Sequence, residues 1–199
     1  MKSTWLITAF EPFAGRPENN SQAVLKEIRK LVDAKVSETD WNFEFHYKTL
    51  PTEYDTCHTT LMEQIKLLQK QGVKIAGVLS LGEGAEDFKL ETQANNFDDV
   101  PGFPDNKGVI RVEQKIFSDH TDDVIPMRFP FEAFGRIRTS KSPGFYVCNH
   151  LCAKMAKEFS TEKHPYFGFI HVPRTGMGGI FTADVCAAII VNGFKKIGT

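Results

Sequence analysis

Two side chains of this sequence have the types needed for a nucleophile and its base, Cys148 and His171. Cys148 lies in GFYVCNH, residues 144–150, between an apolar stretch that predicts a strand at 145–147 and a predicted helix at 151–159. The free N–H groups and the dipole of a helix N-terminus favour a thiolate, so we expect an activated thiol here. His171 lies near the end of a predicted strand, residues 167–172, which Pro173 stops. A thiol and an imidazole at two strand ends are the minimum for nucleophilic cysteine catalysis, and an inert core cysteine is the alternative interpretation.

A Cys–His pair usually needs a third group that fixes the imidazole and stabilises its charged form. The loop after a predicted strand at 73–81 contains four acids, and spacing alone does not choose among them: Glu83, Glu86, Asp87 and Glu91. Taken singly, each is better explained as a solvated loop charge. The glycines of this loop lack the pattern of a phosphate-binding loop, so we do not expect a phosphate site there.

Strands alternate with helices along the chain and must position these groups. We expect further strands at 5–10 and 43–50, helices at 21–32, 56–71 and 181–194, and a weak helical segment at 131–137, with residues 83–142 otherwise mostly irregular. This alternation predicts a single α/β domain over residues 1–199, built around a mostly parallel sheet. Sites in such sheets lie at the carboxyl ends of the strands, where Phe10, Gly82, Cys148 and His171 fall.

Composition excludes several classes of function. The 199 residues are 41% hydrophobic, enough for one core, and a net charge of −1 gives no general attraction to nucleic acid or to a membrane surface. The first apolar run is too short for an export signal, so we expect a cytoplasmic protein with reduced cysteines. Cys57, Cys152 and Cys186 lie in helix-like segments and are expected in the core.

A metal site is not predicted. The other histidines show no ligand spacing and are expected on the surface or in the core: His46, His58, His120, His150 and His164. Asp98, Asp99 and Asp105 have the chemistry to hold a cation, but the turn sequence PDNKG at 104–108 explains them equally well.

Four motifs follow one another in the order and spacing of a known family. They are TAFEPFAG at 8–15 with Asn19 and Ser21 after it, FPDNKG at 103–108, GFYVCNH at 144–150 and GFIHVP at 168–173. With these motifs, nearly the whole chain resembles pyrrolidone-carboxylate peptidase (pyroglutamyl peptidase I), a cysteine peptidase family that removes an N-terminal pyroglutamate.

The resemblance implies a fold, a mechanism and a set of residues. The fold is a three-layer α/β/α sandwich without a metal or organic cofactor. Cys148 is the nucleophile that forms a thioester acyl-enzyme, His171 is the base, and LETQANN at 90–96 selects Glu91 as the third member. Substrate contacts are expected from Phe10, Phe13, Asn19, Glu83, Phe145, Tyr146 and Val147. The partners implied are peptides with an N-terminal pyroglutamate and further copies of the chain, as a tetramer or dimer.

Three departures from the family pattern leave other functions open. Glu83 stands where the family usually has glutamine, Thr92 replaces an arginine, and the stretch between Pro130 and Cys148 is short, which predicts a reduced crossover helix. An ionised Glu83 in the pocket would change its substrate preference. The alternatives are a cysteine hydrolase for a different N-terminal or cyclic amide, and a non-enzymatic relative that binds a peptide.

Overall fold

A six-stranded sheet forms the centre of this computed structural model, which describes residues 2–35 and 41–197. In spatial order its strands are β2 (Phe43–Leu50), β1 (Ser3–Phe10), β3 (Ile75–Glu83), β10 (Tyr166–Val172), β4 (Lys89–Glu91) and β9 (Arg138–Ser140). The first four are parallel, β4 runs antiparallel to β10, and β9 is parallel to β4. The predicted, mostly parallel sheet is confirmed.

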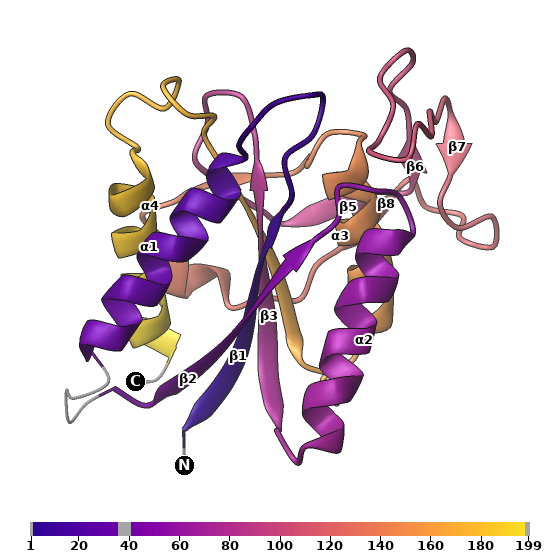
Figure 1. Cartoon of the computed structure of the whole chain (residues 1–199). Helices are drawn as coiled ribbons and strands as arrows, with labels where there is room; N and C mark the ends of the chain where they lie inside the picture. The colour runs from indigo at the N-terminus through magenta and orange to yellow at the C-terminus, as the bar shows by residue number, and fades with distance from the viewer. Residues whose placement is uncertain (1, 36–40, 198–199) are drawn as a thin grey trace.

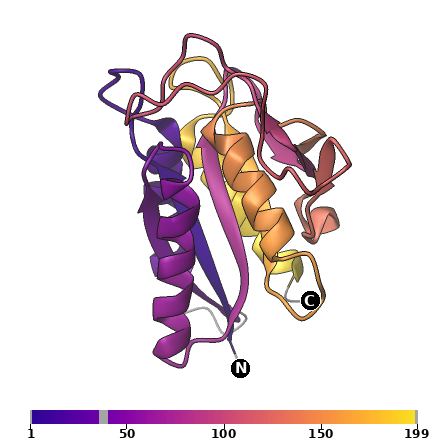
Figure 2. The ribbon, with the colours of Figure 1, turned by 90° about the vertical axis from the view of Figure 1, so that its right-hand side faces the viewer.

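Two pairs of helices cover the two faces of this sheet. In Figure 1, α1 (Asn20–Lys35) and α4 (Ala183–Ile197) lie on one side, and α2 (Thr56–Lys70) and α3 (Val147–Glu158) lie on the other. Figure 2 shows α2 and α3 side by side in front of the sheet. The result is the predicted three-layer α/β/α arrangement.

The pattern of apolar residues explains these layers. From Val78 to Leu81, β3 is fully buried, as expected for a parallel strand covered on both faces. On the other side of β1, the edge strand β2 is only partly buried along most of its length. In α1, the buried residues Val24, Ile28 and Val32 recur at helical spacing and form the stripe that packs on the sheet.

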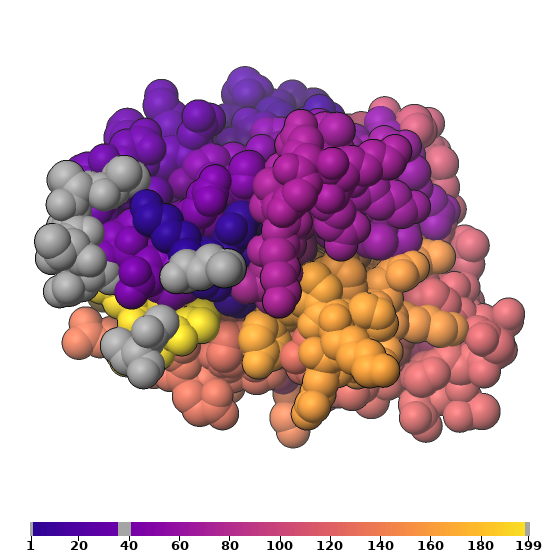
Figure 3. Space-filling model, turned by 90° about the horizontal axis from the view of Figure 1, so that it is seen from below, coloured from indigo at the N-terminus to yellow at the C-terminus, as the bar shows by residue number. Residues whose placement is uncertain are grey.

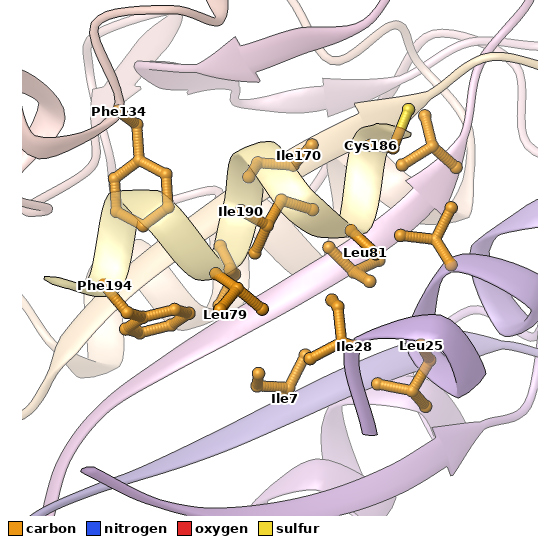
Figure 4. Close-up of a cluster of buried hydrophobic side chains, with 14 of the residues drawn as sticks. Ile7, Leu25, Ile28, Leu79, Leu81, Phe134, Ile170, Cys186, Ile190 and Phe194 are labelled. Carbon is orange, nitrogen blue, oxygen red and sulfur yellow. The ribbon is translucent and has the colours of Figure 1, made fainter. Parts of the chain in front are cut away.

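The core on the α1 and α4 face is continuous from one end of the sheet to the other. In Figure 4, Ile28 of α1 and Ile190 of α4 meet Leu79 and Leu81 of β3. All four side chains are fully buried, and each contributes about 1.5–3 kcal/mol by leaving water. This packing holds the central strands, whose carboxyl ends carry the candidate site.

Short elements replace the irregular region predicted for residues 83–142. Two small two-stranded sheets pair β5 (Gln93–Asn95) with β8 (Val124–Pro126) and β6 (Phe97–Asp98) with β7 (Gln114–Lys115). In Figure 1, β6 and β7 lie in the part that projects at the upper right, and β5 and β8 lie beside α3. Between β8 and β9 there is one 3₁₀ turn, η1 (Phe131–Phe134), within the weak helical segment predicted at 131–137.

The predicted strand before Cys148 is wrong. Gly144 has a φ of +82°, which interrupts an extended run, and α3 already begins at Val147. The amide of Asp99 donates to the carbonyl of Phe145, which ties this turn to the end of β6. Cys148 is therefore delivered by a turn into a helix, without a preceding strand.

The opposite edge of the sheet, where the parallel strands begin, carries a separate feature. Figure 3 views the molecule from this side. A cavity of about 620 Å³ is lined there by residues that include Lys74, Arg128 and Tyr166, far from the carboxyl ends of the strands. No helix in the described ranges has the length and apolar character needed to cross a membrane.

Candidate active site

Glu91 and His171 form a buried hydrogen-bonded pair on neighbouring antiparallel strands. Glu91 lies opposite Phe169, and His171 lies opposite Lys89, so the pair is diagonal on one face of the sheet. The Nδ1 atom of His171 is 2.9 Å from Oε1 of Glu91, whose side chain is fully buried. When the Nδ1–H group donates this hydrogen bond to the carboxylate, Nε2 is the ring nitrogen left to act as a base.

Cys148 is the second residue of α3 and lies against the end of β3. Gly82 makes this approach possible. A Cβ atom built on Gly82 would lie 2.9 Å from Sγ of Cys148 and 2.6 Å from Cζ of Phe169. Both distances are shorter than a normal contact, so a residue without a side chain is required where the helix N-terminus meets the strand.

The same glycine relates Cys148 to His171. Gly82 and His171 are register partners in the parallel pair β3–β10, and such partners direct their side chains to the same face. The ring of Phe169 packs 5.0 Å from the ring of His171 and also touches the Cβ position of Gly82. The structure therefore brings Cys148, His171 and Glu91 to one end of one face of the sheet.

Burial raises the pKa of the Cys148 thiol to about 12, and the negative charges of Glu91 and Glu83 act in the same direction. The prediction of an activated thiolate at a helix N-terminus is therefore wrong for the free protein. The helix dipole favours the thiolate, but the apolar surroundings favour the neutral thiol and outweigh it. At neutral pH a base therefore has to take the thiol proton for the sulfur to attack.

Asn149 fixes the first turn of α3 to the neighbouring small strands. Its Oδ1 atom accepts from the backbone amide of Asn95 at 2.8 Å. Its Nδ2 group donates to the carbonyls of Asn95 and Phe97 at 3.1 and 2.8 Å. With a further bond from Nδ2 to Oδ1 of Asp98, four hydrogen bonds of one buried side chain hold the residue next to Cys148 in place.

An ion cluster fixes the same turn from its other side, and sequence reasoning missed it. His150 Nδ1 lies 2.7 Å from Oδ2 of Asp98, and Nε2 lies 3.0 Å from Oδ1 of Asp55. Arg111 pairs with both acids and is 3.0 Å from Asp98. Asp98 and His150 are buried, so this aspartate has a structural partner and is not part of a loose turn. Only the position of His150 two residues after Cys148 could have pointed to it.

Asp105 follows the simpler of its two predicted roles. Its carboxylate accepts from the backbone amides of Tyr54, Lys107 and Val109, as a turn-forming aspartate does. No group of three or more potential metal ligands gathers within the part of the chain that the structure describes.

Three aromatic rings form a cluster next to Cys148. The ring of Phe13 lies 6.0 Å from Tyr146 and 6.3 Å from Phe103, and the last two are 5.2 Å apart. The Tyr146 hydroxyl donates to the carbonyl of Pro104 at 2.9 Å, which joins the cluster to the loop at 103–108. Phe103 was not predicted as a site residue, although it begins the FPDNKG motif.

The remaining predicted contact residues are placed differently. Phe10 is buried and packs on Phe169, and Val147 is fully buried in the core below α3. Asn19 is buried and caps α1, because its Oδ1 atom accepts hydrogen bonds from the amide and the hydroxyl of Ser21. Phe145 is partly exposed and stacks on Phe97 at 5.0 Å.

Glu83 departs from the prediction that it faces the substrate pocket. Its side chain is buried and pairs with Arg16, and its Oε1 atom is 3.4 Å from Nε of Arg174. Its Oε2 atom accepts from the backbone amide of Asn20 at 2.7 Å, at the N-terminus of α1. The physical reason is compensation, because a buried carboxylate is stable only beside positive charge and hydrogen-bond donors.

The arginine missing at Thr92 has a partial replacement. Nζ of Lys89 lies 3.9 Å from Oε1 of Glu91, so a positive charge is still present beside the acid. The Thr92 hydroxyl donates to the carbonyl of Ser140 and links β4 to β9.

The pyroglutamyl peptidase family model matches residues 3–188 of the chain. The chain belongs to this family. Among its relatives, pyrrolidone-carboxylate peptidase 1 of Caldanaerobacter subterraneus is 30% identical over 178 residues, covering 84% of this chain and 81% of the relative. The enzyme of Yersinia pestis, also called pyrrolidone-carboxylate peptidase, is 31% identical over 181 residues, covering 84% and 77%.

Solved structures agree with this membership. Pyroglutamyl peptidase I of Bacillus amyloliquefaciens superposes with a TM-score of 0.80 at 20% identity, covering 99% of this chain and 97% of the other. Pyrrolidone carboxyl peptidase of Thermus thermophilus gives a TM-score of 0.71 at 26% identity, covering 96% and 98%. The resemblance inferred from four motifs is confirmed, and the pyroglutamyl peptidase fold extends over nearly the whole chain.

Proposed function

We propose that this protein is a cysteine peptidase that hydrolyses the amide bond after an N-terminal pyroglutamate. Cys148 acts as nucleophile, His171 as general base and acid, and Glu91 as the group that orients His171. The observation that carries the proposal is the buried His171–Glu91 hydrogen bond on the sheet edge where Cys148 meets Gly82, in a member of this peptidase family.

The proton path follows from the hydrogen bonds. Glu91 holds the proton on Nδ1 of His171, so Nε2 takes the proton of the Cys148 thiol. Because burial keeps the thiol protonated at neutral pH, this transfer accompanies attack on the substrate carbonyl. His171 then protonates the leaving amine, and water hydrolyses the thioester with His171 again acting as base.

The N-terminus of α3 supplies stabilisation for the tetrahedral intermediate. Backbone N–H groups in the first turn of a helix have no partner within the helix and lie at its positive end. Cys148 occupies this turn, so the oxyanion forms beside these donors. One such donor typically contributes about 3 kcal/mol to the transition state.

The aromatic cluster supports recognition of an uncharged ring. Phe13, Phe103 and Tyr146 present apolar faces beside the nucleophile, and burying the charge of a free glutamate against them would be costly. The pyroglutamyl lactam carries no charge and is flat, which suits these walls. Phe10 and Val147 belong to the buried core against which Tyr146 packs.

We place the activity in the cytoplasm, where free thiols persist, because all four cysteines of the chain are unpaired. Assembly into a dimer or tetramer remains part of the proposal and rests on the family resemblance.

The test is release of the fluorophore from a pyroglutamyl aminocoumarin amide at neutral pH. The wild-type protein should be active, Cys148→Ala should lose activity by at least about 10³-fold, and Glu91→Gln should lose roughly 10²–10⁴-fold with little change in KM. An active Cys148→Ala variant would contradict the nucleophile. If the wild-type protein is inactive but iodoacetamide still labels Cys148, the proposed substrate is wrong, and a hydrolase that acts on another amide becomes the better explanation.

A further inference from the structure

One carboxylate joins three segments that surround the candidate active site. Glu83, at the end of β3, binds Arg16 from the loop after β1, Arg174 from the loop after β10, and the first amide of α1. Its side chain is 1% exposed. A carboxylate this buried would be strongly destabilising without compensation, which Arg16, Arg174 and the Asn20 amide supply together.

Arg16 connects this junction to the aromatic cluster. Its guanidinium carbon lies 4.5 Å from the centre of the Phe13 ring, within the range of a cation–π contact. The same guanidinium pairs with Glu83, so one side chain contacts both the buried acid and the ring. Arg174 binds the same acid, and its own backbone amide donates to Ala85.

Phe13 needs such support because its loop is a tight turn outside the sheet. The next two residues, Ala14 and Gly15, both have positive φ angles, 55° and 69°. The Phe13 side chain is only partly buried. Its ring contacts are to Tyr146 and Phe103 on one side and to Arg16 on the other.

We propose that Glu83 and Arg16 form an ionic strut that fixes the Phe13 ring, and that Glu83 thereby determines affinity for the substrate ring without touching it. Both residues are positioning residues. The inference rests on the proposed function only in assigning the ring of pyroglutamate to the Phe13 wall. It also explains how an acid is tolerated at this position, since its charge is neutralised by arginine and does not face the ligand.

The test compares Arg16→Met and Glu83→Gln with Arg174→Met as the matched control. Arg174 binds the same carboxylate but has no contact with Phe13 among its described interactions. Steady-state kinetics on the pyroglutamyl aminocoumarin amide should show KM raised about five- to tenfold in the first two variants, with kcat within about twofold. Arg174→Met should leave both constants within about twofold. The double variant should raise KM no more than the more impaired single variant does, because both changes remove the same strut.

Two kinetic results would overturn the inference. An unchanged KM in Arg16→Met would mean that Phe13 is held without the strut. A lower KM or higher kcat in Glu83→Gln would mean that the acid faces the substrate, as the sequence alone suggested. If Glu83→Gln does not fold, the KM of Arg16→Met still tests the inference, because Arg16 is partly exposed and its replacement is tolerated more easily.

A readout independent of turnover separates this inference from the proposed function. NMR spectra of protein with ring-labelled phenylalanine, in which Phe13→Leu assigns the Phe13 signal, should show that signal shifted or broadened in Arg16→Met and not in Arg174→Met. If the wild-type protein is silent on the pyroglutamyl amide, the proposed function fails while the NMR result still tests the strut. An unmoved Phe13 signal in Arg16→Met would overturn the strut whatever the substrate.

Discussion

Gly82→Ala should disable the site while leaving the fold in place. The new Cβ would lie 2.6 and 2.8 Å from two ring carbons of Phe169 and 2.9 Å from Sγ of Cys148. Carbon atoms in contact prefer a separation of about 3.5–4.0 Å, so the neighbours must move by about 1 Å. Phe169 is fully buried between the rings of Phe10 and His171, whereas Cys148 is only half-buried. Both groups therefore have to shift, and the less confined sulfur of Cys148 moves the most.

A displacement of this size affects both the reaction rate and the stability of the fold. Misplacing a reacting atom by about 1 Å lowers the rate by about 10²-fold, and overpacking a core destabilises the fold by about 1–3 kcal/mol. We expect kcat/KM for the pyroglutamyl amide to fall by about 10²-fold per folded molecule, with folding checked by thermal and urea unfolding.

Gly77→Ala on the same strand is the matched control. Its Cβ would lie 2.3 Å from a ring carbon of Trp5, at the end of β3 away from Cys148. It should destabilise the fold at least as much as Gly82→Ala and keep kcat/KM per folded molecule within about twofold. A folded Gly82→Ala variant with wild-type kcat/KM would refute the reasoning, because the sulfur would then not depend on its contact with β3.

Two further predictions concern stability. Asp98→Asn should lower the free energy of unfolding by about 3–5 kcal/mol, because it leaves the buried Arg111 charge without one of its two acids. Urea unfolding measures this loss. A loss below about 1 kcal/mol would contradict a stabilising role for the cluster. Stability should also fall at alkaline pH. Burial raises the pKa of Cys148 and of Cys186 to about 12, from 9.0, so between these values the unfolded chain releases protons that the native protein keeps. The free energy of unfolding should therefore be unaffected by these thiols below about pH 9 and fall above it by up to about 1.4 kcal/mol per pH unit for each. If urea unfolding gives the same free energy of unfolding at pH 8 and pH 10, the native fold does not protect these thiols from deprotonation.

The sequence was sufficient for the parts of the fold that depend on local pattern. The predicted strand at 43–50 coincides with β2, and the predicted helix at 56–71 differs from α2 by one residue. Long apolar runs and helical stripes report burial on their own. The strands between residues 83 and 142 are two or three residues long, too short to show a period.

The candidate site was predictable in its members and not in its surroundings. Cys148 and His171 were visible as chemistry at element ends, while Glu91 needed the family resemblance, since the pairing of β4 with β10 joins residues 80 positions apart. The raised pKa of Cys148 depends on burial by distant segments, which the local helix argument does not include. The partners of Glu83 lie 63 to 91 positions away in sequence, so no local pattern could reveal them.

The most direct test of the central claim is to trap the acyl-enzyme. The protein is mixed with a pyroglutamyl ester or aminocoumarin amide, quenched in acid within one turnover, digested and examined by mass spectrometry. We predict a pyroglutamyl group in thioester linkage on Cys148, formed in the wild-type protein, strongly reduced in Glu91→Gln and absent in Cys148→Ala. Hydrolysis of the substrate with Cys148 unmodified at every quench time, and undiminished in Cys148→Ala, would contradict the account.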